Sequence, residues 1–303
     1  MSVYGLGANP FGSRADEDTS IRIIHHALDH GVNLIDTANS YTDGHSERII
    51  GKALQGRREQ AVLATKCGWP LGEGPNEGGS SRGHIMREID RSLRRLETDY
   101  VDLYQIHQFD PETPLDETLR ALDDLVRGGK VRYIGCSNYA AWQLCKALWM
   151  SDRYGVARFD SAQPRYSPAD RRIETELVPA CLDQGVGLLV YFPLDGGILT
   201  GKYQLGAPPP PTSRAVTQPR FAQNVTDQKL RLAEDMARIA AEANVTLAQL
   251  TLAWVMHRPG VTSALIGVTR IAQQEENLRA VEITLDVATV ERVTELSREF
   301  VAF

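Results

Sequence analysis

The stretch Val101-Asp-Leu-Tyr-Gln-Ile-His107 shows the pattern that decides the fold, a short and mostly aliphatic run that ends in a polar side chain. A run of this length and composition is typical of a buried strand. Its polar end has counterparts at intervals of about 30 residues, which is the length of one strand and one crossover helix. The same kind of run occurs at 3–6, 32–35, 61–65, 131–136, 159–162, 186–190 and 264–266.

The gaps between these runs carry apolar residues at helical spacing. At 18–30, for example, the apolar stripe repeats about every 3.6 residues, and Gly31 follows as a helix end. Strands that alternate with helices form a parallel sheet, and eight such units favour one (β/α)8 barrel over residues 1–303. Further helices are expected at about 48–54, 82–96, 115–126, 140–153, 174–184, 227–243, 246–257, 271–280 and 287–298.

A doubly wound open sheet is the alternative arrangement of the same elements. A dinucleotide-binding sheet of that kind carries G-x-G-x-x-G after its first strand. Here Pro10 stands where the third glycine belongs after Gly5 and Gly7, so the fingerprint is absent. The sequence therefore favours the closed barrel.

One interval, from Tyr191 to Gly267, is far longer than the rest. It contains the proline-rich run 206–212, which cannot lie inside a helix. We expect a long loop at about 195–225 that covers one face of the barrel after its seventh strand. A linker between two domains is the alternative. The helix at 287–298 is expected as an extra C-terminal element.

Composition excludes several classes of protein. Hydrophobic residues make up 42% and charged residues 24% of the chain, as in ordinary globular proteins. No apolar run approaches the roughly 18 residues of a membrane span. A formal net charge of −6 provides no global field that would hold nucleic acid or an anionic membrane, so neither is an expected partner. Four scattered cysteines and the lack of a leader-like segment favour the cytoplasm.

The carboxyl ends of the strands meet at one face of such a barrel, where catalytic residues stand. That face is expected to carry Asp36, Lys66 and His107, with Tyr41 in the loop after Asp36. A phenol has a pKa of about 10, and a nearby ammonium such as that of Lys66 should lower it. Asp36 would keep Lys66 charged, and His107 would bind the substrate oxygen or relay a proton. This set suits proton donation to a carbonyl oxygen, given a cofactor that supplies hydride.

A metal-dependent hydrolase on the same fold is a rival hypothesis. It needs several His and Asp side chains at strand ends, and only His107 and Asp36 qualify. The set also lacks a nucleophile suited to acyl transfer. The residues therefore favour reduction of C=O, and no metal is expected.

These residues lie in motifs that resemble those of the aldo-keto reductase family along nearly the whole chain. Asp36-Thr-Ala-Asn-Ser-Tyr41 resembles its D-T-A-x-x-Y, and Gly44-His-Ser-Glu47 is similar to its G-x-S-E. The segments at 64–66, 103–107 and 129–138 resemble three further strands of the family. The resemblance implies reduction of an aldehyde or ketone, with Tyr41 as proton donor and with Asp36, Lys66 and His107 completing the catalytic set.

The resemblance also implies a nicotinamide cofactor, usually NADPH, with NADH as the alternative. Ser137, Asn138 and Gln163 match family residues that hold the carboxamide. Tyr191 matches the aromatic residue that stacks on the nicotinamide ring. Backbone N–H groups at a helix start beside Arg270 would suit a 2′-phosphate. The resemblance implies further cofactor contacts from Asp36, Phe192, Pro193, Leu194, Lys202, Arg214, Gly267, Thr269, Gln273, Glu276 and Asn277.

The chain departs from the family pattern at several positions near this expected cofactor site. Phe192 and Asp195 stand where serine and a small residue are common. Gln163-Pro-Arg-Tyr166 carries an unusual Pro164-Arg165, and Gln273 stands where some members have an arginine. Phe192 and Asp195 therefore indicate pyrophosphate contacts that differ from the usual ones, and the expected preference for NADPH rests mostly on Arg270 and Lys202.

The expected substrate is a small carbonyl compound whose identity the sequence leaves open. Trp69, three residues after Lys66, should form a wall of its pocket together with His107. The family includes monomers and homo-oligomers, so either state fits. Some members serve as redox-sensing subunits of ion channels. A nicotinamide-binding regulatory subunit with little turnover is therefore the alternative function.

Overall fold

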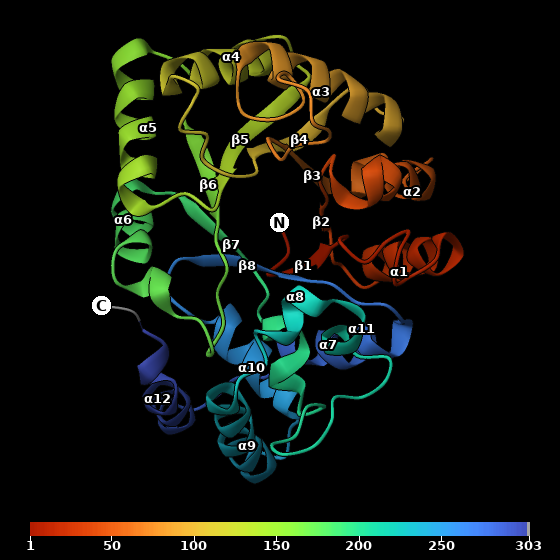
Figure 1. Ribbon diagram of the computed structural model, residues 1–303, viewed down its shortest axis with the longest axis vertical. Coiled ribbons are helices and arrows are strands. Elements are labelled where there is room, and N and C mark those ends of the chain that lie inside the picture. The colour runs from red at the N-terminus through yellow and green to blue at the C-terminus, as the bar shows by residue number, and fades with distance from the viewer. Residues whose placement is uncertain (302–303) are drawn as a thin grey trace.

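The computed structural model describes residues 1–301, in which eight parallel strands close into a barrel in sequence order. The strands are β1 (Tyr4–Gly7), β2 (Leu34–Asp36), β3 (Val62–Cys67), β4 (Val101–Ile106), β5 (Val131–Ser137), β6 (Phe159–Gln163), β7 (Gly187–Tyr191) and β8 (Val261–Ile266). The barrel closes where Tyr4 of β1 pairs with Ala264 of β8. The predicted (β/α)8 barrel is confirmed, and Figure 1 shows its helices arranged around the strands.

The predicted helices form within one turn of their expected ends. They are α1 (Glu17–Asp29), α2 (His45–Ala53), α3 (Arg82–Leu96), α4 (Leu115–Arg127), α5 (Ala141–Tyr154), α6 (Leu177–Gln184), α9 (Asp227–Glu242), α10 (Leu247–Met256), α11 (Ile271–Leu278) and α12 (Val287–Leu296). Asp16, Ser81 and Thr246 start α1, α3 and α10 because each side chain accepts a hydrogen bond from a backbone N–H in the first turn. In residues 1–301 no single helix meets the length and composition of a membrane span; α9 and α10 do so only as a pair bent by 92°.

The long loop predicted after β7 is confirmed, and it contains three short helical turns. These are η4 (Asp195–Thr200), α7 (Arg214–Thr217) and α8 (Pro219–Ala222). Their side chains form a small core of their own, because Ile198, Tyr203 and Phe221 pack together with Leu230 of α9. Figure 1 shows α7 and α8 beside α11 and at some distance from α3 and α4. The loop therefore packs as a distinct layer at one side of the barrel.

The extra C-terminal helix, α12, is also confirmed. The buried Arg171, in the segment between β6 and α6, donates to the carbonyl oxygen of Thr294 at 2.6 Å and to Oγ of Ser297 at 3.0 Å. Its remaining N–H groups bind the Glu174 carboxylate at 2.7 and 2.9 Å. Nε1 of Trp254 in α10 donates to Oγ1 of Thr294 at 3.2 Å. These polar contacts hold α12 against the barrel.

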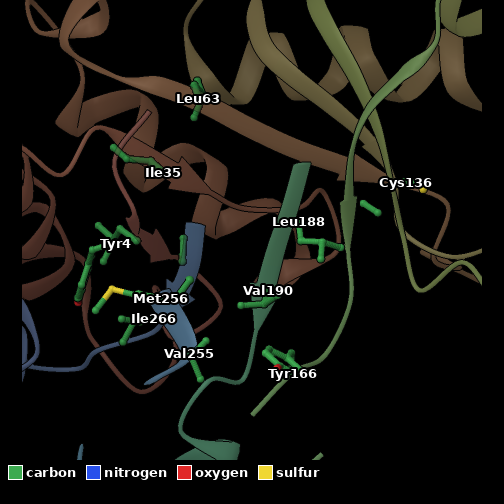
Figure 2. Close-up of a cluster of buried hydrophobic side chains, with 14 of the residues drawn as sticks. Tyr4, Ile35, Leu63, Cys136, Tyr166, Leu188, Val190, Val255, Met256 and Ile266 are labelled. Atoms are coloured by element: carbon green, nitrogen blue, oxygen red, sulfur yellow. The ribbon is translucent and has the colours of Figure 1, made fainter. Parts of the chain in front are cut away.

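The main core lies between the strands and the surrounding helices. Strand side chains alternate between the two faces of the sheet, so every second residue points outward into this layer. Figure 2 shows outward residues of the strands together with Val255 and Met256 of α10. The labelled strand residues are Tyr4, Ile35, Leu63, Cys136, Leu188, Val190 and Ile266.

The positions that alternate with these outward residues fill the inside of the barrel. A small apolar cluster occupies one layer, made of Leu34, Ala64, Leu103, Leu189 and Leu265. Two residues further along the strands toward their carboxyl ends, the inward positions become polar. The apolar layer therefore forms a floor, and the polar residues above it face the end of the barrel where the loops lie.

Gly135 of β5 leaves room for this polar layer. A Cβ atom at Gly135 would lie 2.5 Å from Oγ of Ser161 and 3.2 Å from Cγ of Gln105. Gly135→Ala should therefore lower the free energy of unfolding by about 1–3 kcal/mol through overpacking. Urea denaturation measures this value. Gly83→Ala in α3 is the control, because no atom lies within 4 Å of its added Cβ. Equal stability of the two variants would contradict the prediction.

Candidate active site

A buried ion pair stands at the centre of the barrel mouth. Nζ of Lys66, at the end of β3, donates to Oδ1 of Asp36 at 2.5 Å and to the backbone oxygen of Thr37 at 2.7 Å. The Lys66 side chain is 0% exposed. Burial opposes its charge, but the Asp36 carboxylate beside it raises the pKa of Lys66 above the ordinary value. Lys66 therefore stays a cation inside the protein.

The second carboxylate oxygen of Asp36 is held by two amides. Nε2 of Gln105 donates to Oδ2 of Asp36 at 3.1 Å, and Nε2 of Gln163 donates to it at 2.9 Å. Nε2 of Gln163 also lies 3.1 Å from Oε1 of Gln105. A carboxylate only accepts, so both amides must turn their nitrogen atoms toward Asp36. Oε1 of Gln163 is left without a hydrogen bond in residues 1–301 and can accept one from a ligand.

Tyr41 lies beside this ion pair, at the start of the short helix η1 (Tyr41–Gly44). Nζ of Lys66 is 5.2 Å from the centre of the Tyr41 ring. The expected lowering of the pKa of Tyr41 is wrong in sign. Burial raises this pKa, and the charge of Lys66 offsets only part of the rise. Tyr41 therefore keeps its proton at neutral pH.

His107, directly after β4, faces both Tyr41 and Trp69. The His107 ring meets the Tyr41 ring edge to face at 5.8 Å between centres and the Trp69 ring at 5.7 Å. Burial and then the charge of Lys66 lower the pKa of His107 to about 2. The imidazole is therefore neutral at neutral pH. Its buried Nδ1 has no partner within residues 1–301, and the half-exposed Trp69 lies at the opening of the site.

The residues expected at the carboxamide form one hydrogen-bonded chain across β4 to β7. Oγ of Ser137 donates to the backbone oxygen of Gln163 at 2.8 Å. Nδ2 of Asn138 donates to the backbone oxygen of His107 at 2.9 Å and to Oγ of Ser137 at 3.1 Å. The Tyr191 hydroxyl donates to Oδ1 of Asn138 at 2.8 Å. The fold thus brings together residues from four separate strands.

A group of positive charges lies in the loops after β1, β7 and β8. Partial desolvation and the charges of Arg14, Arg214 and Arg270 lower the pKa of Lys202, so these four residues lie near one another; we call them the cation cluster. Desolvation and its cationic neighbours also lower the pKa of Arg214, to about 10. In residues 1–301 none of the four lies within 4 Å of a carboxylate oxygen. Unpaired cations in a group are suited to bind a polyanion.

The start of α11 adjoins this cluster. Oε1 of Gln273 accepts hydrogen bonds from the backbone N–H of Thr269 at 2.9 Å and from its hydroxyl at 3.1 Å, so Gln273 is used within the helix start. Arg270 is the residue directly before the first turn of α11. Its backbone is extended and its side chain is exposed. Gly267 lies against Pro10 of the loop after β1, because a Cβ at Gly267 would be 3.2 Å from Cγ of Pro10. Arg14 belongs to this same loop.

The remaining expected contacts lie around these groups. The Phe192 ring, in the turn after β7, lies 4.7 Å from the Arg214 guanidinium carbon. Pro193 and Leu194 continue this turn. Asn277 is buried, and the backbone oxygen of Glu276 accepts a hydrogen bond from Nε2 of Gln249 at 3.2 Å.

Sequence reasoning missed two residues of the site. Gln105 could have been found from strand alternation, because it points inward two positions before His107. Arg14 could have been found as a basic residue in the loop after the first strand.

The part of the chain that the structure describes contains no group of three His, Cys, Asp or Glu side chains that could hold a metal ion.

Comparisons with known proteins agree with the fold. A sequence model described as the Aldo/keto reductase family matches residues 4–298. The chain is 38% identical over 290 residues to a probable voltage-gated potassium channel subunit beta of Arabidopsis thaliana, covering 93% of this chain and 88% of that protein. It is 38% identical to the uncharacterized oxidoreductase YrpG of Bacillus subtilis, with 94% and 89% covered. It is 33% identical to the aldo-keto reductase YhdN of Bacillus subtilis, with 91% and 82% covered.

The buried pair can be tested by unfolding. Lys66→Met leaves the Asp36 carboxylate buried without its cation, and it should lower the free energy of unfolding by about 3–5 kcal/mol. The double variant Asp36→Asn with Lys66→Met removes both charges and should recover much of that loss. Urea denaturation of the single and double variants measures the coupling. Additive effects would show that the two charges do not depend on each other.

Proposed function

Because the chain belongs to the aldo/keto reductase family, we propose that it reduces a small aldehyde or ketone with NADPH and that Tyr41 donates the proton. Relatives that carry the names oxidoreductase and aldo-keto reductase support this class of activity. The observation that carries the proposal is the buried Asp36–Lys66 pair beside a protonated Tyr41. This arrangement favours a proton donor over a nucleophile.

The described residues fit a nicotinamide dinucleotide. Oε1 of Gln163 is free to accept from a carboxamide, and the cation cluster has no carboxylate partners of its own in residues 1–301. Tyr191 is held by Asn138 at the same end of the barrel. When bound, the reduced cofactor would supply the hydride that the carbonyl carbon receives.

The proton comes from Tyr41 in this proposal. Its raised pKa keeps the hydroxyl protonated until the carbonyl oxygen becomes negative. As the proton leaves, negative charge forms on the phenol oxygen near the ammonium of Lys66, which stabilises it. Asp36 keeps Lys66 charged and in place at 2.5 Å. The ion pair therefore contributes most when the charge develops.

The neutral His107 would orient the substrate. Its ring lies edge to face with that of Tyr41, where a carbonyl oxygen must lie to receive the proton. A neutral imidazole can donate one hydrogen bond to that oxygen without adding a charge. Trp69, packed against His107, would form an apolar wall at the entrance. This pocket favours a small carbonyl compound that has an apolar part.

The cation cluster supports NADPH over NADH. The two cofactors differ by one 2′-phosphate, and a helix start with an arginine is a good site for a phosphate group. Arg270 is in that position on α11. Arg14, Lys202 and Arg214 would then share the pyrophosphate. We infer the preference for NADPH from this unpaired positive charge.

A regulatory subunit with little turnover is the second candidate. It is favoured by the likeness to a protein named as a probable voltage-gated potassium channel subunit beta in Arabidopsis thaliana, at 38% identity. Such a protein would still need the cofactor site. The two functions therefore differ in turnover and not in binding of NADPH.

Tyr41→Phe tests the proton donor. The variant should lose at least about 10²-fold in kcat for a simple aldehyde such as 4-nitrobenzaldehyde, because general acid catalysis is removed. Its Kd for NADPH should stay unchanged. Tyr133→Phe, an exposed tyrosine on β5, is the matched control and should retain wild-type kcat. Absorbance at 340 nm follows the reaction. Wild-type turnover in Tyr41→Phe would contradict the proposed role of Tyr41 as proton donor. If the wild type binds NADPH without any turnover, that result would favour the regulatory function.

Arg270→Ala tests the cofactor preference. It should raise Kd for NADPH about tenfold and change Kd for NADH much less, because only NADPH has the 2′-phosphate. Fluorescence titration of each cofactor gives both values. Arg279→Ala, an exposed arginine in the turn after α11, is the control. A parallel loss of affinity for both cofactors would place Arg270 at a phosphate that they share.

A further inference from the structure

The turn directly after β7, residues 192–199, adopts a strained backbone. Phe192 has φ of 58° and Asp195 has φ of 47°, which is the left-handed region that residues other than glycine rarely adopt. Gly196 and Gly197 follow with φ of 68° and 101°. Each non-glycine residue in this region costs about 1–2 kcal/mol. Such a turn persists only when its surroundings hold it.

Asp195 provides the contacts that hold the turn. Its carboxylate is completely buried, and it binds Arg165 in an ion pair. Nζ of Lys229 in α9 donates to Oδ2 of Asp195 at 2.8 Å, and Nδ2 of Asn224 donates to Oδ1 at 3.2 Å. Asn224 in turn accepts from Lys229 at 2.7 Å and from Arg165 at 3.1 Å. We call these four residues the Asp195 network.

The network joins three segments that are far apart in the sequence. Arg165 belongs to the segment after β6, Asp195 belongs to the turn after β7, and Asn224 and Lys229 belong to the end of the long loop and to α9. A buried carboxylate is stable only when it is paired and hydrogen-bonded. The turn therefore cannot move away from α9 without leaving Asp195, Arg165 and Lys229 unpaired.

The same turn also contacts the cation cluster. A Cβ atom at Gly197 would lie 2.4 Å from Nζ of Lys202, so the Lys202 ammonium lies close to the backbone of the turn. The Phe192 ring lies 4.7 Å from the Arg214 guanidinium and 5.4 Å from that of Arg165. Phe221 of α8 packs on Gly196 in the same manner. Lys202 and Arg214 of the cluster thus contact the turn that Asp195 holds in place.

We propose that Asp195 is a positioning residue for the cofactor: its carboxylate fixes the 192–199 turn, and with it Lys202 and Arg214, in the arrangement that receives the phosphates. The inference rests on the proposed function, because NADPH is its ligand. Asp195 itself does not face the phosphates, since its oxygens are occupied by Arg165, Lys229 and Asn224. It acts through the backbone of the turn. Arg165 and Asp195, which both depart from the family pattern, form an ion pair with each other.

Asp195→Asn keeps the shape of the side chain and removes its charge. We expect dissociation of NADPH to become about tenfold faster, because the turn is no longer fixed by an ion pair. The rate of hydride transfer in a single turnover with saturating NADPH and aldehyde should stay unchanged. Stopped-flow fluorescence measures the dissociation, and rapid mixing with absorbance at 340 nm measures the single turnover.

Asp123→Asn is the matched control. Asp123 in α4 is also buried and paired, with Nε of Arg127 at 2.6 Å, but it lies outside the 192–199 turn and the cation cluster. This variant should lose stability without faster dissociation of NADPH. A merely structural role for Asp195 would make the two variants alike, with a smaller folded fraction and a wild-type dissociation rate. That result would overturn the proposal.

A second variant keeps the proposal testable if Asp195→Asn folds poorly. Asp195→Asn with Lys229→Met removes the buried carboxylate and one of its two cations, while Arg165 keeps the Asp170 carboxylate at 3.3 Å, so this variant should be the more stable protein. Because the turn again lacks its buried carboxylate, dissociation of NADPH from this double variant should still be faster than from the wild type. A wild-type dissociation rate in the double variant would overturn the proposal. A wild-type protein that binds no NADPH would instead overturn the proposed function, and with it this inference.

Discussion

The ion pair between Asp36 and Lys66 is the interaction on which the rest of the site depends. Removing two charges from water costs several kcal/mol for each ion, and the barrel interior tolerates this only because every polar atom of the pair has a partner. The carboxylate also determines the orientation of Gln105 and Gln163, whose nitrogen atoms must face it. The ammonium places a positive charge beside Tyr41. In the proposed function, binding of the carboxamide and proton donation therefore both depend on this one buried pair.

The 192–199 turn contacts two groups of charges that differ in their pairing. Asp195 in the turn is completely buried and is paired with Arg165 and Lys229. Lys202 and Arg214 next to the turn have no carboxylate oxygen within 4 Å in residues 1–301. Paired charges stabilise a fixed shape, whereas unpaired charges of one sign attract a polyanion. In our proposal Asp195 therefore gives the turn a fixed shape, and Lys202 and Arg214, which lie outside it, attract the phosphate groups.

Much of the fold was predictable because strand alternation and helical periodicity are local properties of the sequence. The ends of the strands also predicted that Asp36, Lys66 and His107 would lie at one face, since parallel strands of a barrel end together. The sign of the Tyr41 pKa shift was not predictable. It depends on how much protein surrounds the phenol, and burial outweighs the charge of Lys66. Arg14 was missed because its neighbours come from distant loops.

The sequence by itself determined the barrel, the long loop after β7, the extra C-terminal helix and the residue types at the strand ends, because each follows from a repeat or a spacing that needs no long-range contact. Only the tertiary structure decided which charges are paired. Arg165 and Asp195 were visible as two separate departures, 30 residues apart, and their ion pair exists because the segments after β6 and β7 meet beside α9. Pairing is a property of distance in space, which the order of residues does not contain.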